Sequence, residues 1–236
     1  MTSLTNQRVL VVGGSSGIGY AVAEQALAAG AKVTIASRSE QKLAEAAAGL
    51  GDVETAVLDT GDESAVESFF AGSDAWDHVV ISAAQTPSGP VRKLSLEDAK
   101  RAMESKFWGA YRIARAARFA ERGSLTLISG FLSERPSGSS VLQGAINAAL
   151  ESLGRGLALE LSPVRVNAVS PGLIDTPLWA KMEEANRNAM FERVAASLPA
   201  KTIGQPSDIA NAVLFLMTTP FATGSTVRVD GGGVIG

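Results

Sequence analysis

The stretch RVLVVGGSSGIG, residues 8–19, decides the fold. Its first five residues form an apolar, β-branched run that predicts a buried strand, and the glycine-rich run after it leads into a helical pattern. Glycines allow a tight turn in which the backbone approaches an anion, and the N-terminus of the next helix supplies unpaired N–H groups. Because a strand precedes the glycines and a helix follows them, we expect this loop to bind the phosphates of a nucleotide. A purely structural turn is the alternative.

The alternation of strand and helix continues along the chain. Near-continuous apolar strands separated by helices predict a parallel sheet covered on both faces, and right-handed crossovers then give a doubly wound, three-layer α/β fold of Rossmann type. We expect one domain over residues 1–236. The seven predicted strands are 8–12, 32–37, 53–58, 78–82, 124–129, 164–169 and 226–230. The predicted helices are 18–29, 40–48, 62–71, 96–120, 143–161 and 207–217.

Composition argues against several classes of protein. The net charge is −3 and no cluster of Lys or Arg stands out, so neither nucleic acid nor an anionic membrane is an expected partner. There is no cysteine and only one histidine, His78, so we expect no disulfide, no thiol nucleophile and no metal. Segment Met1–Gln7 lacks the apolar core of a secretion signal, and no apolar run is long enough to span a membrane. A cytoplasmic protein is the expectation.

Several motifs in the same order resemble those of one family. Residues 13–19 have the spacing Gly-x-x-x-Gly-x-Gly, 165–172 read RVNAVSPG and 229–232 read VDGG. With these motifs the chain resembles the short-chain dehydrogenase/reductases over nearly its whole length. The resemblance implies a nicotinamide cofactor, a small-molecule substrate, a Pro-Gly turn beside the nicotinamide, and contacts to the cofactor from Ile174 and Thr176.

The end of the second predicted strand, ASRS at 36–39, indicates which nicotinamide cofactor is bound. An NAD-selective Rossmann site has an acid here that binds the ribose 2′-hydroxyl, but the first acid in this chain is Glu40. The guanidinium of Arg38, flanked by the hydroxyls of Ser37 and Ser39, suits a 2′-phosphate instead. We therefore expect NADP(H). A solvated arginine at the start of a helix is the alternative.

Asp59 ends the third predicted strand. The resemblance implies that it accepts a hydrogen bond from the adenine amino group, with Thr60 beside it. Its alternative role is a helix N-cap, for which Asp62 is better placed. The predicted cofactor contacts are Gly13, Ser15, Ser16, Gly17, Ile18, Gly19, Ser37, Arg38, Ser39, Asp59, Thr60, Ser82, Ala83, Ala84, Asn147, Pro171, Gly172, Ile174 and Thr176.

The catalytic pattern of the family is absent from this sequence. The resemblance implies a tetrad of Asn, Ser, Tyr and Lys, in which the tyrosine donates a proton to the substrate carbonyl. The motifs that flank these positions fix the register, and the four positions hold Lys106, Gly130, Gln143 and Asn147. No tyrosine follows Tyr111, so no small shift of register restores the phenol.

Four residues are candidates for the missing chemistry: Lys106, Gln143, Asn147 and Asp175. A carboxamide does not ionise, so Gln143 can bind a substrate carbonyl but is a poor proton donor. Asn147 can hold the ribose hydroxyls of the nicotinamide, and Asp175 lies at the expected mouth of its pocket. Lys106 is the titratable newcomer. If it is buried, desolvation lowers its pKa toward a useful range; otherwise it is a solvated residue of a long helix.

Segment 177–199 interrupts the strand–helix rhythm after a strand end, where ligands bind in such sheets, and we expect it to be a substrate lid. Trp179 and Met182 are expected to line the site. The helix at 143–161 is rich in small residues, which suits close packing. The resemblance implies that it forms a subunit contact in a homodimer or homotetramer.

Three functions remain at this point. The first is an NADP(H)-dependent oxidoreductase that reduces a small carbonyl or imine by an atypical proton transfer. The second is a non-catalytic NADP(H)-binding sensor or regulatory protein. The third is a non-redox enzyme, an isomerase or cyclase, on the same scaffold. The retained cofactor motifs favour the first, and the replaced tetrad is the best support for the others.

Overall fold

The computed structural model describes residues 3–236 and contains the seven predicted strands. In the described residues the strands form one parallel sheet in the order β3-β2-β1-β4-β5-β6-β7, so the chain reverses direction across the sheet between β1 and β4. This is the doubly wound Rossmann-type topology that the sequence predicts. The strands are β1 (Arg8–Val12), β2 (Lys32–Ser37), β3 (Glu54–Val57), β4 (Trp76–Ile81), β5 (Phe119–Ile128), β6 (Arg165–Pro171) and β7 (Thr226–Val229).

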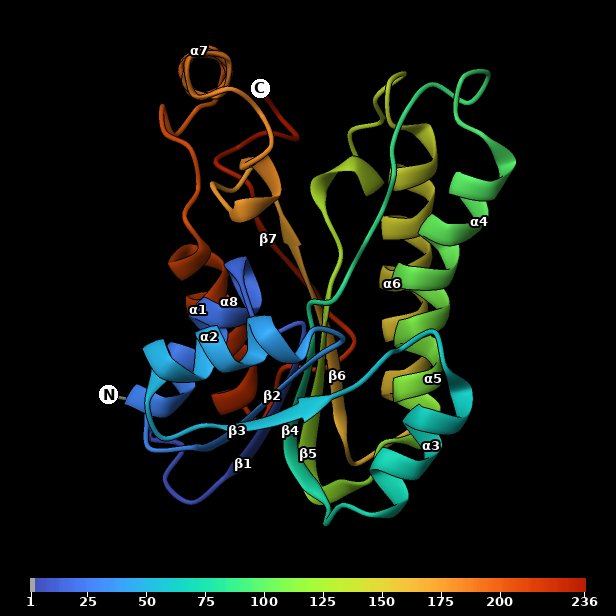
Figure 1. The fold of residues 1–236 in the computed structure, drawn as a ribbon, viewed down its shortest axis with the longest axis vertical. Helices are drawn as coiled ribbons and strands as arrows, with labels where there is room; N and C mark the ends of the chain where they lie inside the picture. Colours follow the sequence, from blue (N-terminus) through green and yellow to red (C-terminus); the bar gives the residue numbers. More distant parts are fainter. Residues whose placement is uncertain (1–2) are drawn as a thin grey trace.

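Helices cover both faces of this sheet (Figure 1). Two apolar clusters result, because nearly every strand is buried on both sides. One lies under α1 (Gly17–Ala28), α2 (Glu40–Leu50) and α8 (Pro206–Thr218). The other lies under α3 (Glu63–Ala71), α5 (Gly109–Ala116) and α6 (Val141–Glu160).

The single long helix predicted at 96–120 is wrong. The segment consists of α4 (Leu96–Met103), a π-helical turn η1 (Glu104–Trp108) and α5, and β5 begins at Phe119. The backbone N–H of Trp76 donates to Arg118, and Trp76 pairs with Phe119 in the ladder between β4 and β5. Pairing with a neighbouring strand outweighs the local helical pattern here, because those contacts are long-range and invisible to sequence periodicity.

The remaining elements lie at the carboxyl edge of the sheet. Segment 177–199 is not irregular, since it contains a short 3-10 turn η3 (Pro177–Trp179) and a full helix α7 (Glu184–Ser197). A second 3-10 turn, η2 (Phe131–Ser133), follows β5. The prediction for Met1–Gln7 falls partly outside the structure, because Met1 and Thr2 are not among the described residues. Within residues 3–236, no helix is both long enough and apolar enough to cross a bilayer.

His78 is a structural residue of β4, buried in the sheet at the end opposite the phosphate loop. Its Nε2 faces Gln7 Oε1 at 2.8 Å and its Nδ1 faces Ser124 Oγ at 2.8 Å. The amide oxygen can only accept, so Nε2 donates to Gln7 and Nδ1 accepts from the serine hydroxyl. Burial lowers the pKa of His78 to about 4, because the charged ring would be desolvated.

We expect this ring to make the fold acid-sensitive. Between pH 6.5 and pH 4 the imidazole is protonated in the unfolded chain but neutral in the folded protein. The free energy of unfolding therefore falls as pH is lowered through that window. The loss is about 3 kcal/mol when complete. Chemical denaturation at pH 7 and pH 4.5 measures the loss. The one histidine signal in a proton NMR titration gives the pKa directly.

The variant His78→Asn keeps a polar side chain without a titrating ring, so it should lose this part of the pH dependence. A histidine signal that titrates near pH 6.5 would contradict the prediction.

Candidate active site at the carboxyl edge of the sheet

The glycine-rich loop is packed too closely to admit side chains at two positions. Gly13 has a φ of +88°, and a Cβ built on it would lie 2.5 Å from the backbone nitrogen of Ala83. A Cβ on Gly19 would lie 2.2 Å from the carbonyl oxygen of Gly13. The N–H groups of Ser82 and Ala83 both donate to Val12, so the end of β4 is tied to the loop. The loop, the start of α1 and residues 82–83 therefore form one close-packed unit.

The N-terminus of α1 is open, unlike the starts of α2, α3 and α4. Helices α2, α3 and α4 are capped by the side chains of Ser39, Asp62 and Ser95, and each has an acid in its first turn. In the described chain, α1 has neither a side-chain cap nor a first-turn acid, although Ser16 occupies its N-cap position. Unpaired N–H groups and the positive dipole end are left for an anion, as a cofactor phosphate requires.

Thr176 reaches this loop from the other side of the groove. A Cβ on Gly17 would lie 3.4 Å from the Cβ of Thr176, so the two predicted phosphate contacts are brought together. Ile174, by contrast, is buried in the apolar cluster under α1 and α8. On the adjoining strand the Pro171–Gly172 turn packs on the C-terminal motif, since a Cβ on Gly172 would lie 2.7 Å from the Cα of Asp230.

Arg38 extends into solvent beside the loop. The N–H of Gly13 donates to Ala36 at 2.7 Å, which places the end of β2 next to the glycines. In residues 3–236 the Arg38 guanidinium makes no ion pair. The flanking hydroxyls are already engaged, since that of Ser39 caps α2 and that of Ser37 accepts from the Ser39 N–H.

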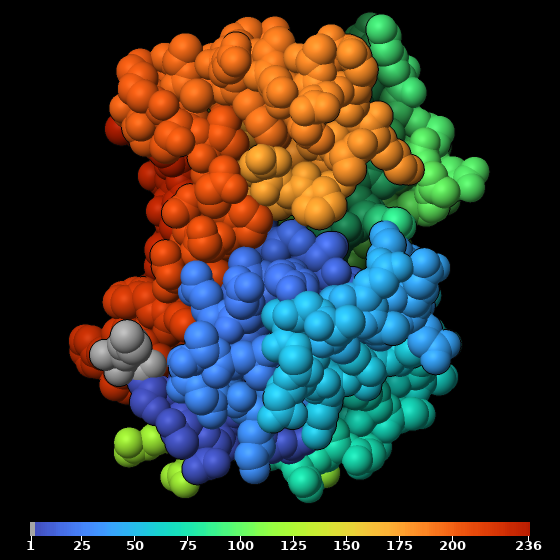
Figure 2. All heavy atoms as spheres, turned by 60° about the vertical axis from the view of Figure 1, so that its left-hand side comes forward, coloured from blue at the N-terminus to red at the C-terminus, as the bar shows by residue number. Residues whose placement is uncertain are grey.

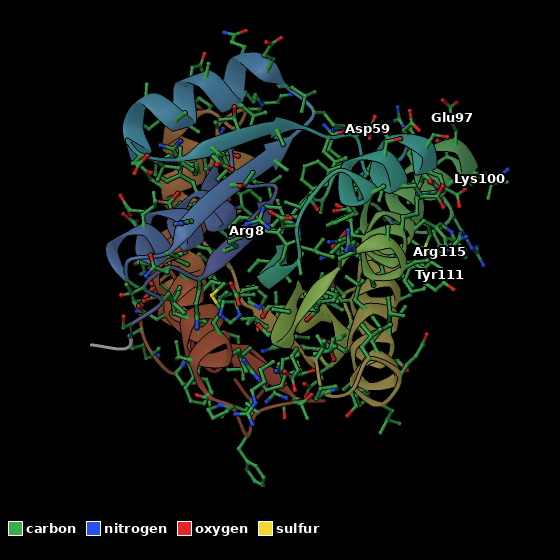
Figure 3. The ribbon with its side chains drawn as sticks, turned by 90° about the horizontal axis from the view of Figure 1, so that it is seen from below. Arg8, Asp59, Glu97, Lys100, Tyr111 and Arg115 are labelled. Atoms are coloured by element: carbon green, nitrogen blue, oxygen red, sulfur yellow. The ribbon has the colours of Figure 1, made fainter. Side chains whose placement is uncertain are left out.

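The two predicted adenine contacts differ in environment. Asp59 is exposed between the end of β3 and the start of α3 (Figure 3), and its Oδ1 accepts from the N–H of Gly61 at 2.9 Å. Asp62, as expected, is the helix cap. Thr60 is buried against α5, where a Cβ on Gly109 would lie 2.8 Å from its hydroxyl. Only Asp59 offers its side chain to the surface.

Lys106 is not a solvated helix residue, because its side chain is turned into the protein and the residue is only 8% exposed. Its Nζ donates to the carbonyl of Ser129 and to Oδ1 of Asn147, both at 2.7 Å. It lies in the π-helical turn η1, a feature that widens a helix locally and frequently marks functional sites. Desolvation lowers the pKa of Lys106 to about 8, partly opposed by the negative charge of Glu151.

Of the other predicted positions, Asn147 contacts this amine directly. Asn147 is buried, and a Cβ on Gly130 would lie only 2.7 Å from its Nδ2, so the absence of a side chain at 130 makes room for the amide. Gln143 lies one turn before Asn147 on the same face of α6. Its Oε1 is buried and has no hydrogen-bond partner within the described chain, which leaves an acceptor for a ligand N–H or O–H.

Sequence reasoning missed Glu151. This carboxylate is 7% exposed, and its Oε1 accepts from the hydroxyls of Ser129 (2.9 Å) and Ser133 (2.7 Å). One available signal was overlooked: Gln143, Asn147 and Glu151 are spaced by four residues, which puts all three on one face of a helix.

Segment 177–199, which the sequence predicts to be a lid, lies beside the Pro171–Gly172 turn. Figure 2 shows it as a lobe above the face formed by α1 and α2. The indole N–H of Trp179 donates to Ile174 at 3.0 Å, and the ring packs edge-on against Phe191. Asp175 is exposed, and Met182 is half-buried. A small cavity of about 180 Å³ lies between the lid and the Pro-Gly turn, lined by Phe131, Arg135, Gly172, Leu173, Val194, Ser197, Leu198, Asp230 and Gly233.

Gly130→Ala should destabilise the protein by about 1–3 kcal/mol, because its Cβ overlaps an amide that Lys106 already holds. Denaturant unfolding measures the loss. The matched control is Gly51→Ala, which also has a positive φ (+86°) but whose Cβ would meet nothing within 4 Å. In an Asn147→Ala background the part of the cost that comes from this overlap should disappear, leaving the strain that a φ of +157° imposes on any side chain at 130. Equal costs in both backgrounds would mean that the overlap is not the cause.

Comparison with known proteins identifies the family of the chain. The family model described as Enoyl-(Acyl carrier protein) reductase matches residues 12–233. Short-chain dehydrogenase/reductase ATR9 of Stachybotrys chlorohalonatus is 36% identical over 98% of this chain and 98% of its own. A crystal structure of a small-chain dehydrogenase in complex with NADPH has 37% identity and a TM-score of 0.86, covering 98% of this chain and 100% of the other. MalC Reductase/Diels-Alderase from Malbranchea aurantiaca has 27% identity and a TM-score of 0.90, covering 99% and 98%. The chain therefore belongs to the short-chain dehydrogenase/reductase family.

Proposed function

We propose that the protein is an NADP(H)-dependent oxidoreductase that reduces a small carbonyl or imine, with Lys106 as the proton donor in an atypical arrangement. The observation that carries this proposal is the buried amine itself. Lys106 is held by Ser129 at the end of β5, and the N–H of Ser129 donates to Val169 in β6, two residues before the Pro-Gly turn. A titratable group is thus held at the edge of the sheet where ligands of such folds bind.

The cofactor part of the proposal rests on the phosphate loop. The uncapped start of α1, the contact between Gly17 and Thr176, and the unpaired guanidinium of Arg38 suit a dinucleotide with a 2′-phosphate. A relative of 37% identity was crystallised with NADPH. When bound, the nicotinamide supplies or accepts a hydride, and the protein contributes placement and charge.

The choice of Lys106 as proton donor rests on the other residues at the tetrad positions, none of which can supply a proton. The four tetrad positions of the family hold Lys106, Gly130, Gln143 and Asn147 in this chain. Neither tyrosine serves as a substitute. Tyr111 points outward from α5 (Figure 3), and the Tyr20 hydroxyl lies against Gly49 in α2. Gln143 offers hydrogen bonds but no proton.

Lys106 can donate a proton because its pKa is close to neutral. As the substrate carbon is reduced, an N–H bond of the ammonium breaks and an O–H or N–H bond forms on the product, which leaves a neutral amine. The amine then recovers a proton from solvent. An iminium substrate is already cationic, so it needs less help from this donor than a ketone does.

A second candidate function is cyclisation on the same scaffold. One structural neighbour, from Malbranchea aurantiaca, is described as both a reductase and a Diels-Alderase. A shaped pocket that binds the nicotinamide can also hold a substrate for ring closure without redox chemistry. Product formation without loss of NADPH would identify that function, and tight cofactor binding with no turnover of any kind would favour a sensor.

The first test of the proposal is cofactor selectivity. Titration with NADPH and NADH, followed by energy transfer from tryptophan to the nicotinamide, should give tighter binding of NADPH. Arg38→Ala should weaken NADPH about 10–100-fold and leave NADH nearly unchanged, because charge-assisted contacts to the 2′-phosphate are lost.

The matched control for that titration is Lys42→Ala, another exposed cation on the same helix start, which should change little. Equal affinities for the two cofactors would refute the selectivity for NADP(H).

Turnover provides the second test. Oxidation of NADPH is followed with a panel of ketones and imines, and Lys106→Met should slow ketone reduction by about 10²–10⁴-fold. The rate should be flat below pH 8 and fall above it, because only the protonated amine donates and its pKa is about 8. Lys100→Met, an exposed lysine at the outer edge of α4 (Figure 3), is the control. Unchanged ketone reduction in Lys106→Met would show that the proton comes from elsewhere.

A further inference from the structure

Glu151 is a buried carboxylate that none of the proposed chemistry uses. Its two donors are hydroxyls, those of Ser129 and Ser133. In residues 3–236 it forms no direct ion pair. A buried carboxylate without a cation in contact is costly, so some other interaction has to offset the loss of hydration.

Ser129 connects this carboxylate to Lys106. The carbonyl of Ser129 accepts from the Lys106 amine, and its hydroxyl donates to Glu151. Helix α6 provides a second connection, because Asn147 accepts from the same amine and Glu151 lies one turn further on the same face. Lys106 and Glu151 are therefore linked through Ser129 and through helix α6, although the two side chains are not in direct contact.

The surrounding charges make this coupling specific. Lys106 is packed against α4, α5, α6 and the end of β5. The one Coulombic partner found for it within the described chain is Glu151. The charge of Glu151 also acts weakly on Arg228 of β7, whose direct partner is Glu134. Glu151 is thus the charge that balances the buried amine.

We propose that Glu151 is a positioning residue for Lys106: it accepts from the hydroxyl of Ser129 and so fixes the carbonyl that aims the amine. The catalytic consequence rests on the proposed function, whereas the coupling between the two side chains does not. Without the carboxylate, desolvation alone acts on the amine and favours its neutral form.

The substitution Glu151→Gln isolates the charge. Glutamine keeps an oxygen that accepts from both serine hydroxyls, so the geometry is retained while the negative charge is removed. We expect the pKa of Lys106 to fall by roughly one unit or more, as is common when a nearby opposite charge is lost. Carbon NMR of lysine labelled at Cε measures this in the full chain without substrate or cofactor, with the Lys106 signal assigned by its absence in Lys106→Met.

The control is Glu97→Gln, an exposed acid at the outer edge of α4 that should leave the Lys106 titration unchanged (Figure 3). Glu151→Asp retains the charge and should keep the pKa of Lys106 close to that of the native chain. A folded Glu151→Gln protein whose Lys106 titrates as in the native chain would overturn the proposal.

If Glu151→Gln does not fold, the coupling can be measured on Glu151 instead of on Lys106. Interaction between two charged groups is reciprocal, so Lys106→Met should shift the Cδ resonance of Glu151, observed with glutamate labelled at Cδ. An unchanged carboxyl also refutes the coupling. Turnover separates this idea from the proposed function: if reduction is found, Glu151→Gln should move the alkaline limb of kcat/KM to lower pH. If no reduction is found while the NMR coupling holds, only the proposed function fails.

Discussion

A lysine amine cannot be removed from water unless other groups replace the water, and this constraint organises the reactive end of the molecule. The π-helical turn directs Lys106 inward, Ser129 and Asn147 accept two of its N–H bonds, and Glu151 balances its charge. The missing side chain at Gly130 belongs to the same set, because it leaves the space that Asn147 fills. Three segments of the chain, η1, the residues just after β5, and α6, are joined by a single buried amine.

The two ends of the candidate site are built from different kinds of group. On the proposed phosphate side the backbone is decisive: close-packed glycines and an open helix start offer N–H groups that suit an anion, with little help from side chains. On the substrate side the side chains decide, and there this chain departs from the residues that its family resemblance implies. A scaffold whose cofactor grip depends on backbone geometry can exchange its reactive side chains without losing the cofactor.

The parts of the fold that local periodicity encodes were predictable. β-branched runs and glycine spacing were sufficient for the seven parallel strands and the phosphate loop. The end of α5 was not predictable, because the pairing of Trp76 with Phe119 that ends the helical run involves a strand distant in sequence. The position of Lys106 in the catalytic pattern was apparent from flanking motifs, but its burial depends on a π-helical turn that has no sequence signature. Glu151 could have been predicted as a site residue, since it lies four residues after Asn147 on the same helix face. A lone acid on a helix, however, ordinarily indicates a solvated face.

The overlap between Gly130 and Asn147 determines which pairs of residues these two positions can hold together. A side chain at 130 and an asparagine seated as it is at 147 exclude each other in this backbone, since a Cβ would lie 2.7 Å from the amide. The two positions are therefore not free to vary one at a time. Placing a side chain at 130 calls for a smaller residue, or another side-chain conformation, at 147. A redesign of this corner of the site has to treat the two positions as one unit.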